Sequence, residues 1–377
     1  MDTSPIRVLL VDDSPLALAV LRRMLSRSPE IQVVGTARNG REALELVPRL
    51  RPAVICTDLH MPEMDGLELT QEVMARFPRP ILVISVSVQE EDTQQVFQLL
   101  EAGAIDVFPK PRGGLKEEDQ QAAQELIKKI KILSKVVTFT RHRRTAPAPA
   151  SPYRRVRRFT LSAPPRLVAI GASTGGPQAL QLILSQLPAD FPVPILCIQH
   201  IMEGFLSSLV NWLASRCAVR VKIARAGEIP LPGTVYFPPE GFHLEIDHTG
   251  RLFPSSRPPF QGHRPSVTVT FNAVAAYYGQ QAIGVLLTGM GKDGAEGMLA
   301  IARAGGITIA QDEESSVVFG MPKQAILLGA AHYVLPVSEI APHLLAFCSP
   351  DRESRHSAFP LQTLPSLPVR PEDDRDE

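Results

Sequence analysis

The stretch Leu167–Leu184 reads LVAIGASTGGPQALQLIL and passes from a strand-like run, through a glycine-rich turn, into a helix-like run. Ser173 and Thr174 lie at the tip of the turn, with glycines on both sides. The apolar positions after the turn recur at i, i+3, i+4 and i+7, the spacing of one helix face: Leu180, Ile183, Leu184 and Leu187. The stretch therefore predicts a strand–turn–helix unit of an α/β domain.

Three kinds of site are compatible with this turn. A Walker-type phosphate loop requires a lysine followed by Ser or Thr after its last glycine, whereas Pro177 and Gln178 follow here. A dinucleotide fingerprint requires G-x-G-x-x-G, and this turn reads G-x-S-x-G-G. The third kind is a turn that presents a nucleophile from the sheet edge, beside the amide groups of a helix start. The pattern favours this third interpretation for Ser173, and Pro177 suits the first helical turn.

A serine hydroxyl needs a base to act as a nucleophile at neutral pH. His200 closes the strand-like run PVPILCIQH, so we expect it at the same sheet edge as Ser173. The run AIGVLLTGMGKDGAEGM predicts a strand that ends at Met290, followed by Asp293 as the orienting carboxylate. Backbone amides of GMGKDG could donate to an oxyanion. Two simpler alternatives remain: His200 as a helix cap or loop residue, and Asp293 as a plain helix N-cap.

The chain before this block, from Ile6 to about Leu133, alternates five strand-like runs with helical patterns, which predicts a parallel sheet with helices on both faces. Polar residues follow the ends of these runs, where parallel sheets bind ligands. They are Asp12 and Asp13 after the first run, Asp58 after the third, Ser85 after the fourth and Lys110 after the fifth. Three clustered carboxylates predict a Mg2+ site. A hydroxyl and a lysine beside them suit a phosphoryl group held on one carboxylate.

The whole chain is expected to be a two-domain α/β protein. We predict a flavodoxin-like, five-stranded parallel domain over 5–123 and a doubly wound, mostly parallel α/β domain over 164–348. Residues 124–163 comprise a helix end and a linker rich in Arg, Pro and Ala, for which a flexible solvated segment is favoured over a nucleic-acid-binding patch. The tail 349–377 is expected to be disordered.

The first block resembles a response-regulator receiver domain through VLLVDDSP, CTDLHMPEMDGLEL, VIS and PKP. The resemblance implies that Asp58 is the phosphoacceptor, that Asp12 and Asp13 join it around Mg2+, and that Ser85 and Lys110 are the phosphorylation switch. Val107 stands where receivers often carry an aromatic switch residue, with Phe108 beside it, and His60 lies two residues past Asp58. These two departures are expected to affect switching and the lifetime of the phosphoaspartate.

The second block resembles the catalytic domain of the chemotaxis-type protein-glutamate methylesterases through GASTGG, QHI, LTGMGKDG, GTVYFPPEGFHL and HRPSV. The resemblance implies Ser173 as nucleophile, His200 as general base and then acid, and Asp293 as orienting carboxylate. It also implies an oxyanion hole from the Met290 amide, with Thr174 in support, and no cofactor for the ester chemistry.

The implied reaction is hydrolysis of glutamate γ-methyl esters on chemoreceptors, with release of methanol, and deamidation of certain receptor glutamines. A histidine kinase phosphodonor and an opposing methyltransferase are the implied partners. The unphosphorylated receiver is expected to block the edge that carries Ser173. One alternative is a non-catalytic response regulator whose second block is a docking module, and a weaker one is a DNA-binding output.

Composition agrees with a soluble cytoplasmic protein. The hydrophobic share of 44% and charged share of 21% are ordinary for a globular chain, and the net charge of +0 gives no sign of a nucleic-acid partner. We read no secretory signal at the start and no apolar run long enough to span a membrane. The four cysteines are widely spaced, which argues against a disulfide framework or a metal site.

Overall fold

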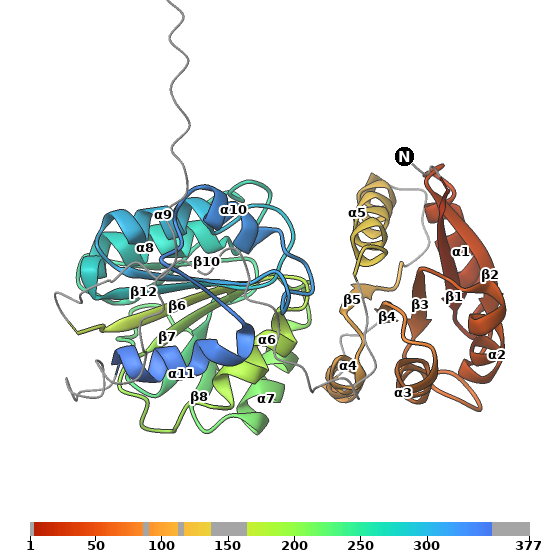
Figure 1. Cartoon of the computed structure of the whole chain (residues 1–377), viewed down its shortest axis with the longest axis horizontal. Helices are drawn as coiled ribbons and strands as arrows, with labels where there is room; N and C mark the ends of the chain where they lie inside the picture. Colours follow the sequence, from red (N-terminus) through yellow and green to blue (C-terminus); the bar gives the residue numbers. More distant parts are fainter. Residues whose placement is uncertain (1–3, 86–89, 112–116, 137–163, 349–377) are drawn as a thin grey trace, which may run out of the picture.

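The computed structural model describes residues 4–85, 90–111, 117–136 and 164–348. It shows two parallel β-sheets, each covered by helices, that belong to the two predicted blocks (Figure 1). Most of the predicted linker and the whole predicted tail lie outside the described residues. None of the helices in the described ranges is long and apolar enough to cross a membrane.

The N-terminal sheet has five strands in the order β2-β1-β3-β4-β5, and every neighbouring pair is parallel. This is the flavodoxin-like order, as predicted. The strands are β1 (Ile6–Val11), β2 (Ile31–Ala37), β3 (Val54–Asp58), β4 (Ile81–Ser85) and β5 (Asp106–Pro109). The helices are α1 (Pro15–Leu25), α2 (Gly40–Leu50), α3 (Gly66–Arg76), α4 (Glu90–Ala102) and α5 (Glu117–Leu133). Alternate strand residues pack against α1 and α5 on one face and against α2, α3 and α4 on the other.

The C-terminal sheet has seven strands in the order β14-β13-β12-β6-β7-β9-β8, again with parallel neighbours throughout. Its strands are β6 (Leu167–Ala172), β7 (Ile195–Gln199), β8 (Arg220–Ile223), β9 (Thr234–Phe237), β12 (Ala282–Leu286), β13 (Ile307–Gln311) and β14 (Tyr333–Leu335). A separate antiparallel pair is formed by β10 (His243–Ile246) and β11 (Leu252–Ser255). The expected mostly parallel sheet is therefore confirmed.

Helices cover both faces of this second sheet (Figure 1), as a doubly wound fold requires. One face carries α6 (Gly176–Leu184), α7 (Leu206–Arg216) and α11 (Val337–Cys348). The other carries α8 (Val267–Tyr278), α9 (Ala295–Arg303) and α10 (Met321–Leu327), and a short 3-10 turn, η1 (Gly279–Gln281), follows α8. Along β6, Val168 and Ile170 pack toward the first face and Leu167 and Ala169 toward the second. The sheet is thus buried on both sides.

The strand order reverses direction next to β6. From β6 the chain continues outward on one side through β7, and it later returns to the other side through β12 and β13. In open α/β sheets, ligands bind at the carboxyl ends of the strands beside such a reversal. Ser173 follows β6 directly, so the topology places it at this point.

One predicted boundary is wrong. The strand expected to end at Met290 ends at Leu286, because the chain beyond it leaves the parallel ladder. The backbone N–H of Thr288 donates to the side chain of Gln311 (2.8 Å), and Gly289 forms an isolated bridge with Phe319. Met290 consequently lies in the loop between β12 and α9.

The buried face of α6, the helix after the serine turn, provides a test of the fold. Leu180 is fully buried in α6, whereas Leu327 in α10 is 67% exposed. Leu180→Ala should lower the free energy of unfolding of the C-terminal domain by about 2–5 kcal/mol, because it removes apolar contacts and leaves a cavity. The matched control Leu327→Ala should change it by no more than about 0.5 kcal/mol. Urea denaturation measures both, and equal effects would contradict this packing of α6.

Candidate active site

The turn that carries Ser173 is fixed by hydrogen bonds to its backbone from the loop after β12, from the start of α6 and from a side chain of β7. The N–H of Ser173 donates to the carbonyl of Thr288 (3.0 Å), and its carbonyl accepts from Gly176 N–H (2.8 Å) and from the Gln199 amide (2.8 Å). Gly175 has a φ of +76°, which a residue with a side chain adopts only with strain. The glycine at this position therefore allows the turn between β6 and α6 that the sequence predicts.

His200 and Asp293 form a hydrogen-bonded pair at the same sheet edge. His200 follows β7, and its N–H donates to the carbonyl of Ala172 (3.0 Å). Its Nε2 lies 2.8 Å from Oδ2 of Asp293, whose carboxylate is only 2% exposed. Nδ1 of His200 is also buried, and among the described residues it has no hydrogen-bond partner.

The carboxylate of Asp293 is held by the first turn of α8. Ser266 Oγ donates to its Oδ1 (2.8 Å), Val267 N–H to its Oδ2 (2.7 Å) and Thr268 N–H to its Oδ1 (3.0 Å). The alternative that Asp293 is the N-cap of α9 is not what the structure shows, since that position is occupied by Gly294. Asp293 instead accepts from the N-terminus of a helix that begins 26 residues earlier.

These contacts set the charge of the pair. Burial raises the pKa of the Asp293 carboxyl, but the hydrogen bond and charge of His200 and the bonds from Thr268 outweigh burial and hold the pKa far below its usual range. Asp293 is therefore ionised at neutral pH. It accepts the Nε2 proton of the imidazole, which leaves the lone pair on Nδ1. The base nitrogen in this arrangement would be Nδ1.

Ser173 and His200 line one cavity of about 300 Å3, together with Thr174, Met290 and Gly291. The opposite wall comes from the N-terminal domain: Val96, Phe97, Leu100, Ile105, Asp106, Val107, Glu125, Lys128 and Lys129. Four of the predicted site residues are thus brought together, and Asp293 lies behind His200. Which residues of the first domain form this wall is visible only in the structure.

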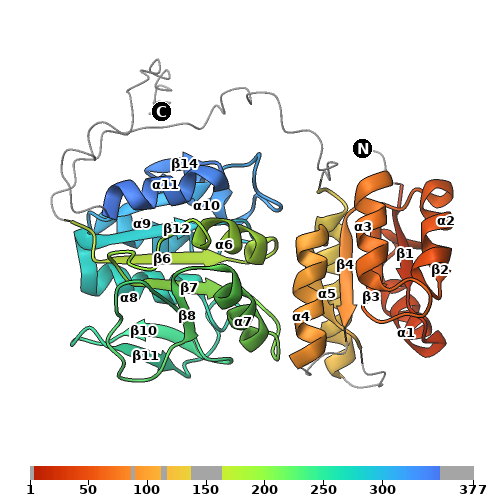
Figure 2. The same ribbon diagram turned by 90° about the horizontal axis from the view of Figure 1, so that it is seen from below.

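The two domains touch through α4 and β5 on one side and α6 and α7 on the other (Figures 1 and 2). Oδ2 of Asp106 accepts from the hydroxyl of Thr174 (3.0 Å) and also contacts the ammonium group of Lys129. Gln178 in α6 donates to the carbonyl of Ala104 (2.9 Å). The residue next to Ser173 is therefore hydrogen-bonded to the N-terminal domain.

A second set of contacts lies at the rim of this interface. The rings of Phe97 and Trp212 stack with centroids 5.0 Å apart. Trp212 Nε1 donates to Glu101 (3.1 Å), and the Arg216 guanidinium lies 3.0 Å from the same carboxylate. An aromatic pair with a charged rim joins α4 to α7.

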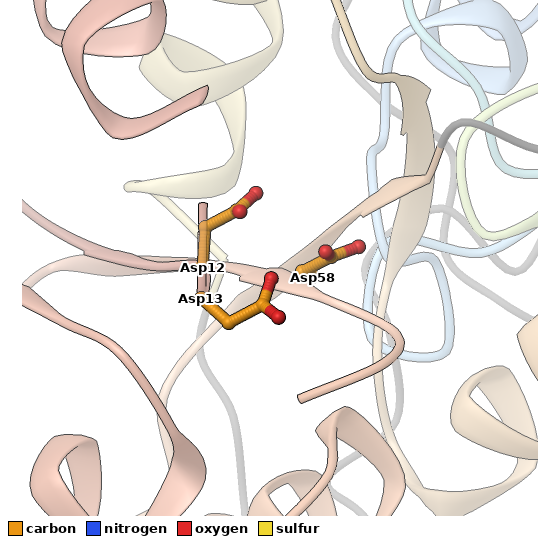
Figure 3. A group of neighbouring side chains, drawn as sticks. All are labelled: Asp12, Asp13 and Asp58. Atoms are coloured by element: carbon orange, nitrogen blue, oxygen red, sulfur yellow. The ribbon is translucent and has the colours of Figure 1, made fainter. Parts of the chain in front are cut away.

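The acidic residues of the N-terminal domain form a cluster at the carboxyl edge of its sheet (Figure 3). Carboxylate oxygens of Asp12, Asp13 and Asp58 lie within 4.8 Å of one another. Nζ of Lys110 is 2.6 Å from Asp58 Oδ2 and 2.8 Å from Asp12 Oδ2. Burial raises the pKa of Asp12, although Lys110 and the N–H of Ser14 act in the opposite direction.

This cluster fits the predicted cation site, because hard carboxylate oxygens are the ligands that Mg2+ prefers. Burial lowers the pKa of Lys110, but the bonds to Asp12 and Asp58 outweigh it, so the lysine stays charged. Ser85 is buried at the end of β4, and its carbonyl accepts from Lys110 N–H (2.7 Å). All five predicted residues therefore meet at one edge.

Val107 and His60, the two departures from the usual receiver pattern, have different surroundings in the structure. His60 is exposed beside the cluster, whereas Val107 is half-buried and lines the interdomain cavity. Phe108, the adjacent aromatic residue, is 1% exposed and packs in the core with α1 and α5.

Comparisons with known proteins match each of the two domains to a known family. A family model described as CheB methylesterase matches residues 168–344, and one described as response regulator receiver domain matches residues 8–131. A protein-glutamate methylesterase/protein-glutamine glutaminase of Nitrosospira multiformis is 43% identical over 89% of this chain and 95% of its own length. A similarly named protein of Methanospirillum hungatei is 41% identical over 89% of this chain and 96% of its own length.

The chain belongs to the protein-glutamate methylesterase/protein-glutamine glutaminase family. The resemblance to this family and the two-domain fold predicted from the sequence are thereby confirmed. The solved catalytic domain of the Thermotoga maritima CheB methylesterase is 42% identical, with a TM-score of 0.47 over 48% of this chain and 98% of that one.

Sequence reasoning missed several residues that support the site. Gln199 and Thr288 hold the serine turn, Ser266 holds Asp293, and Asp106 holds Thr174. Ser266 lies within HRPSV, the motif that the family resemblance had already marked, so attention to that motif would have found it. Gln199 and Thr288 likewise lie within QHI and LTGMGKDG, two further motifs of that resemblance, whereas Asp106 lies in ordinary strand sequence and carries no comparable signal.

The charge of Asp293 gives a pH-dependent prediction. Asp293→Asn should lower the free energy of unfolding by about 3 kcal/mol, because it removes a buried charged acceptor from its donors. The folded pKa lies below the unfolded value of about 3.9, so the stabilisation is present above that pH and declines as the pH falls. Denaturation of both proteins at about pH 5 and about pH 3 should therefore show a smaller difference at the lower pH.

The exposed carboxylate of Asp190 provides the control, and Asp190→Asn should change stability by less than about 0.5 kcal/mol at both pH values. If the difference for Asp293→Asn were the same at both pH values, the fold would not be holding that carboxylate ionised.

Proposed function

We propose that this chain hydrolyses glutamate γ-methyl esters on methyl-accepting chemoreceptors and deamidates selected receptor glutamines. The observation that carries the proposal is the buried His200–Asp293 pair, 2.8 Å apart, beside the cavity that Ser173 lines. The names of the relatives supply the substrate class. The geometry supports acyl transfer through a serine, because it offers a hydroxyl, a base nitrogen and an orienting carboxylate at one sheet edge.

The reaction follows from these groups. Oγ of Ser173 forms a bond to the ester carbonyl carbon while Nδ1 of His200 takes the hydroxyl proton. Collapse of the tetrahedral intermediate breaks the bond to the methoxy group, which leaves as methanol with the proton from His200. Water then attacks the acyl-enzyme, gives its proton to His200 and releases the glutamate, and the proton returns to Ser173. With a glutamine substrate, ammonia leaves in place of methanol.

Asp293 stabilises the imidazolium of His200 during both steps. Its carboxylate is already desolvated and bound by the first turn of α8, so it need not reorganise when the charge forms. The developing oxyanion requires donors, and we assign this task to the backbone amide of Met290 with Thr174 in support. Both residues line the cavity beside Ser173.

We propose that Asp58 accepts a phosphoryl group from a histidine kinase and that this controls the esterase. Mg2+ held by Asp12, Asp13 and Asp58 would neutralise the charge that gathers there. Lys110 is already within 2.6 Å of Asp58 and would contact the phosphoryl oxygens, with the Ser85 hydroxyl as the second switch group. An opposing methyltransferase would restore the esters.

The control would act through the interface. The N-terminal domain forms one wall of the cavity that Ser173 and His200 line, so in this arrangement it lies over the edge that a receptor helix would have to reach. Lys110 follows β5, the strand that carries Asp106, and Asp106 binds Thr174. A shift of β5 on phosphorylation would therefore loosen the contact beside Ser173, and separation of the domains would admit the receptor.

The first test is methanol release from methylated receptor fragments, with and without a small phosphodonor and Mg2+. We expect release that rises with the phosphodonor in the wild type, and at least a thousandfold loss in Ser173→Ala, because the acyl-enzyme cannot form. Thermal unfolding of the variant serves as the control for folding. If the wild type released no methanol from several receptors, the catalytic proposal would fail and a phosphorylation-dependent docking module would be favoured.

The interface gives a separate prediction. Glu101→Ala removes the acceptor for Trp212 and Arg216, which should weaken domain closure by about 1 kcal/mol and raise activity without phosphodonor several-fold. The matched control is Glu45→Ala on the exposed surface of α2 in the same domain, for which no change is expected. An unchanged basal rate in Glu101→Ala would show that this contact does not hold the domains closed.

A further inference from the structure

The imidazole rings of His200 and His263 lie face to face. Their centroids are 4.1 Å apart and their planes differ by 1°. His263 belongs to the loop between β11 and α8 and lines the same cavity as Ser173. Nearly parallel planes at this centroid distance place the two ring faces in contact, so one ring limits the tilt of the other.

The loop holds His263 in place through its backbone. Phe260 and His263 exchange two backbone hydrogen bonds of 3.0 Å. His243 is fully buried; its Nδ1 accepts from Ser266 N–H (3.1 Å), and its Nε2 donates to the carbonyl of Pro258 (3.2 Å). His243 therefore joins both ends of the loop segment that presents His263.

The same segment reaches both partners of the pair. Ser266, three residues after His263, donates to Asp293, while His263 stacks on His200. A single stretch of chain thus fixes the carboxylate and contacts the face of the imidazole. The hydrogen bond from Nε2 to Asp293 fixes one corner of the His200 ring but does not by itself set the ring plane.

The charge state of His263 suits this contact. Burial, followed by the charge of His200, lowers the pKa of His263 to about 4; Asp293 acts in the opposite direction, and Lys128 of α5 lowers it further. At neutral pH the ring is therefore neutral. A neutral aromatic face can lie against the imidazolium that His200 becomes during the reaction, whereas a second cation would repel it.

We propose that His263 is a positioning residue that fixes the ring plane of His200 and so keeps Nδ1 aligned with Ser173. Misplacement of a reacting group by about 1 Å can cost about a hundredfold in rate. The inference rests on the proposed function for its kinetic consequence, but the stacking itself has a readout that is independent of activity.

The kinetic test uses the full chain with phosphodonor and Mg2+. His263→Ala should lower kcat about 10- to 100-fold while KM stays within about twofold, because the change acts mainly on the alignment of the base in the transition state. His263→Phe restores a flat, neutral ring and should recover most of the wild-type kcat. The control is His248→Ala, an exposed histidine of the β10–β11 turn, which should match the wild type.

The structural test is the NMR spectrum of ring-labelled histidines in the same proteins, with the His200 signals assigned by comparison with His200→Gln. Stacking should displace the His200 ring protons upfield in the wild type. The displacement should be lost in His263→Ala and kept in His263→Phe. This measurement applies even if the wild type releases no methanol, so failure of the proposed function is distinguishable from failure of this inference.

Two results would overturn the proposal. One is an unchanged His200 spectrum in His263→Ala, which would mean that the rings do not stack in solution. The other is a kcat as low in His263→Phe as in His263→Ala, with stacking kept in the spectrum, which would show that His263 acts through its nitrogens rather than its face.

Discussion

The site depends on one buried charge, the carboxylate of Asp293. Burying this charge away from water costs free energy unless hydrogen-bond partners compensate for it. The first turn of α8 and the imidazole of His200 supply those partners. That requirement fixes the position of α8 against β6 and β12. Gly171 in β6 permits the close approach, since a Cβ there would lie 2.2 Å from Val267 of α8. Packing and catalytic geometry therefore share one constraint.

One residue likewise serves two contacts at the interface between the domains. Asp106 in β5 contacts both Lys129 within its own domain and Thr174 beside Ser173. The strand that places Asp106 is followed directly by Lys110, which contacts the acidic cluster. A change at Asp58 and a change at the serine turn are therefore separated by one short strand. Such a link needs no long chain of side chains, because β5 alone joins Asp106 to Lys110.

Much of this could be predicted from the sequence, because the relevant patterns are local. Apolar runs followed by helical periodicity give a parallel sheet, and polar residues after those runs must gather at its carboxyl edge. Asp12, Asp58 and Lys110 do so, as do Ser173 and His200. The sequence places the end of β12 at Met290, because apolar residues continue past Leu286. In the structure the strand ends at Leu286, and the N–H of Thr288 donates to the side chain of Gln311 instead of to a neighbouring strand.

The sequence by itself therefore determined the alternation of strands and helices in the first block, the two-domain α/β class and the polar residues that follow the strands of both sites. Only the tertiary structure decided that Asp293 accepts hydrogen bonds from the first turn of α8, that Asp106 binds Thr174, and that His263 stacks on His200. The physical reason is range. Periodicity and turn chemistry act between neighbours in the chain, whereas these contacts join residues 26, 68 and 63 positions apart that only packing brings together.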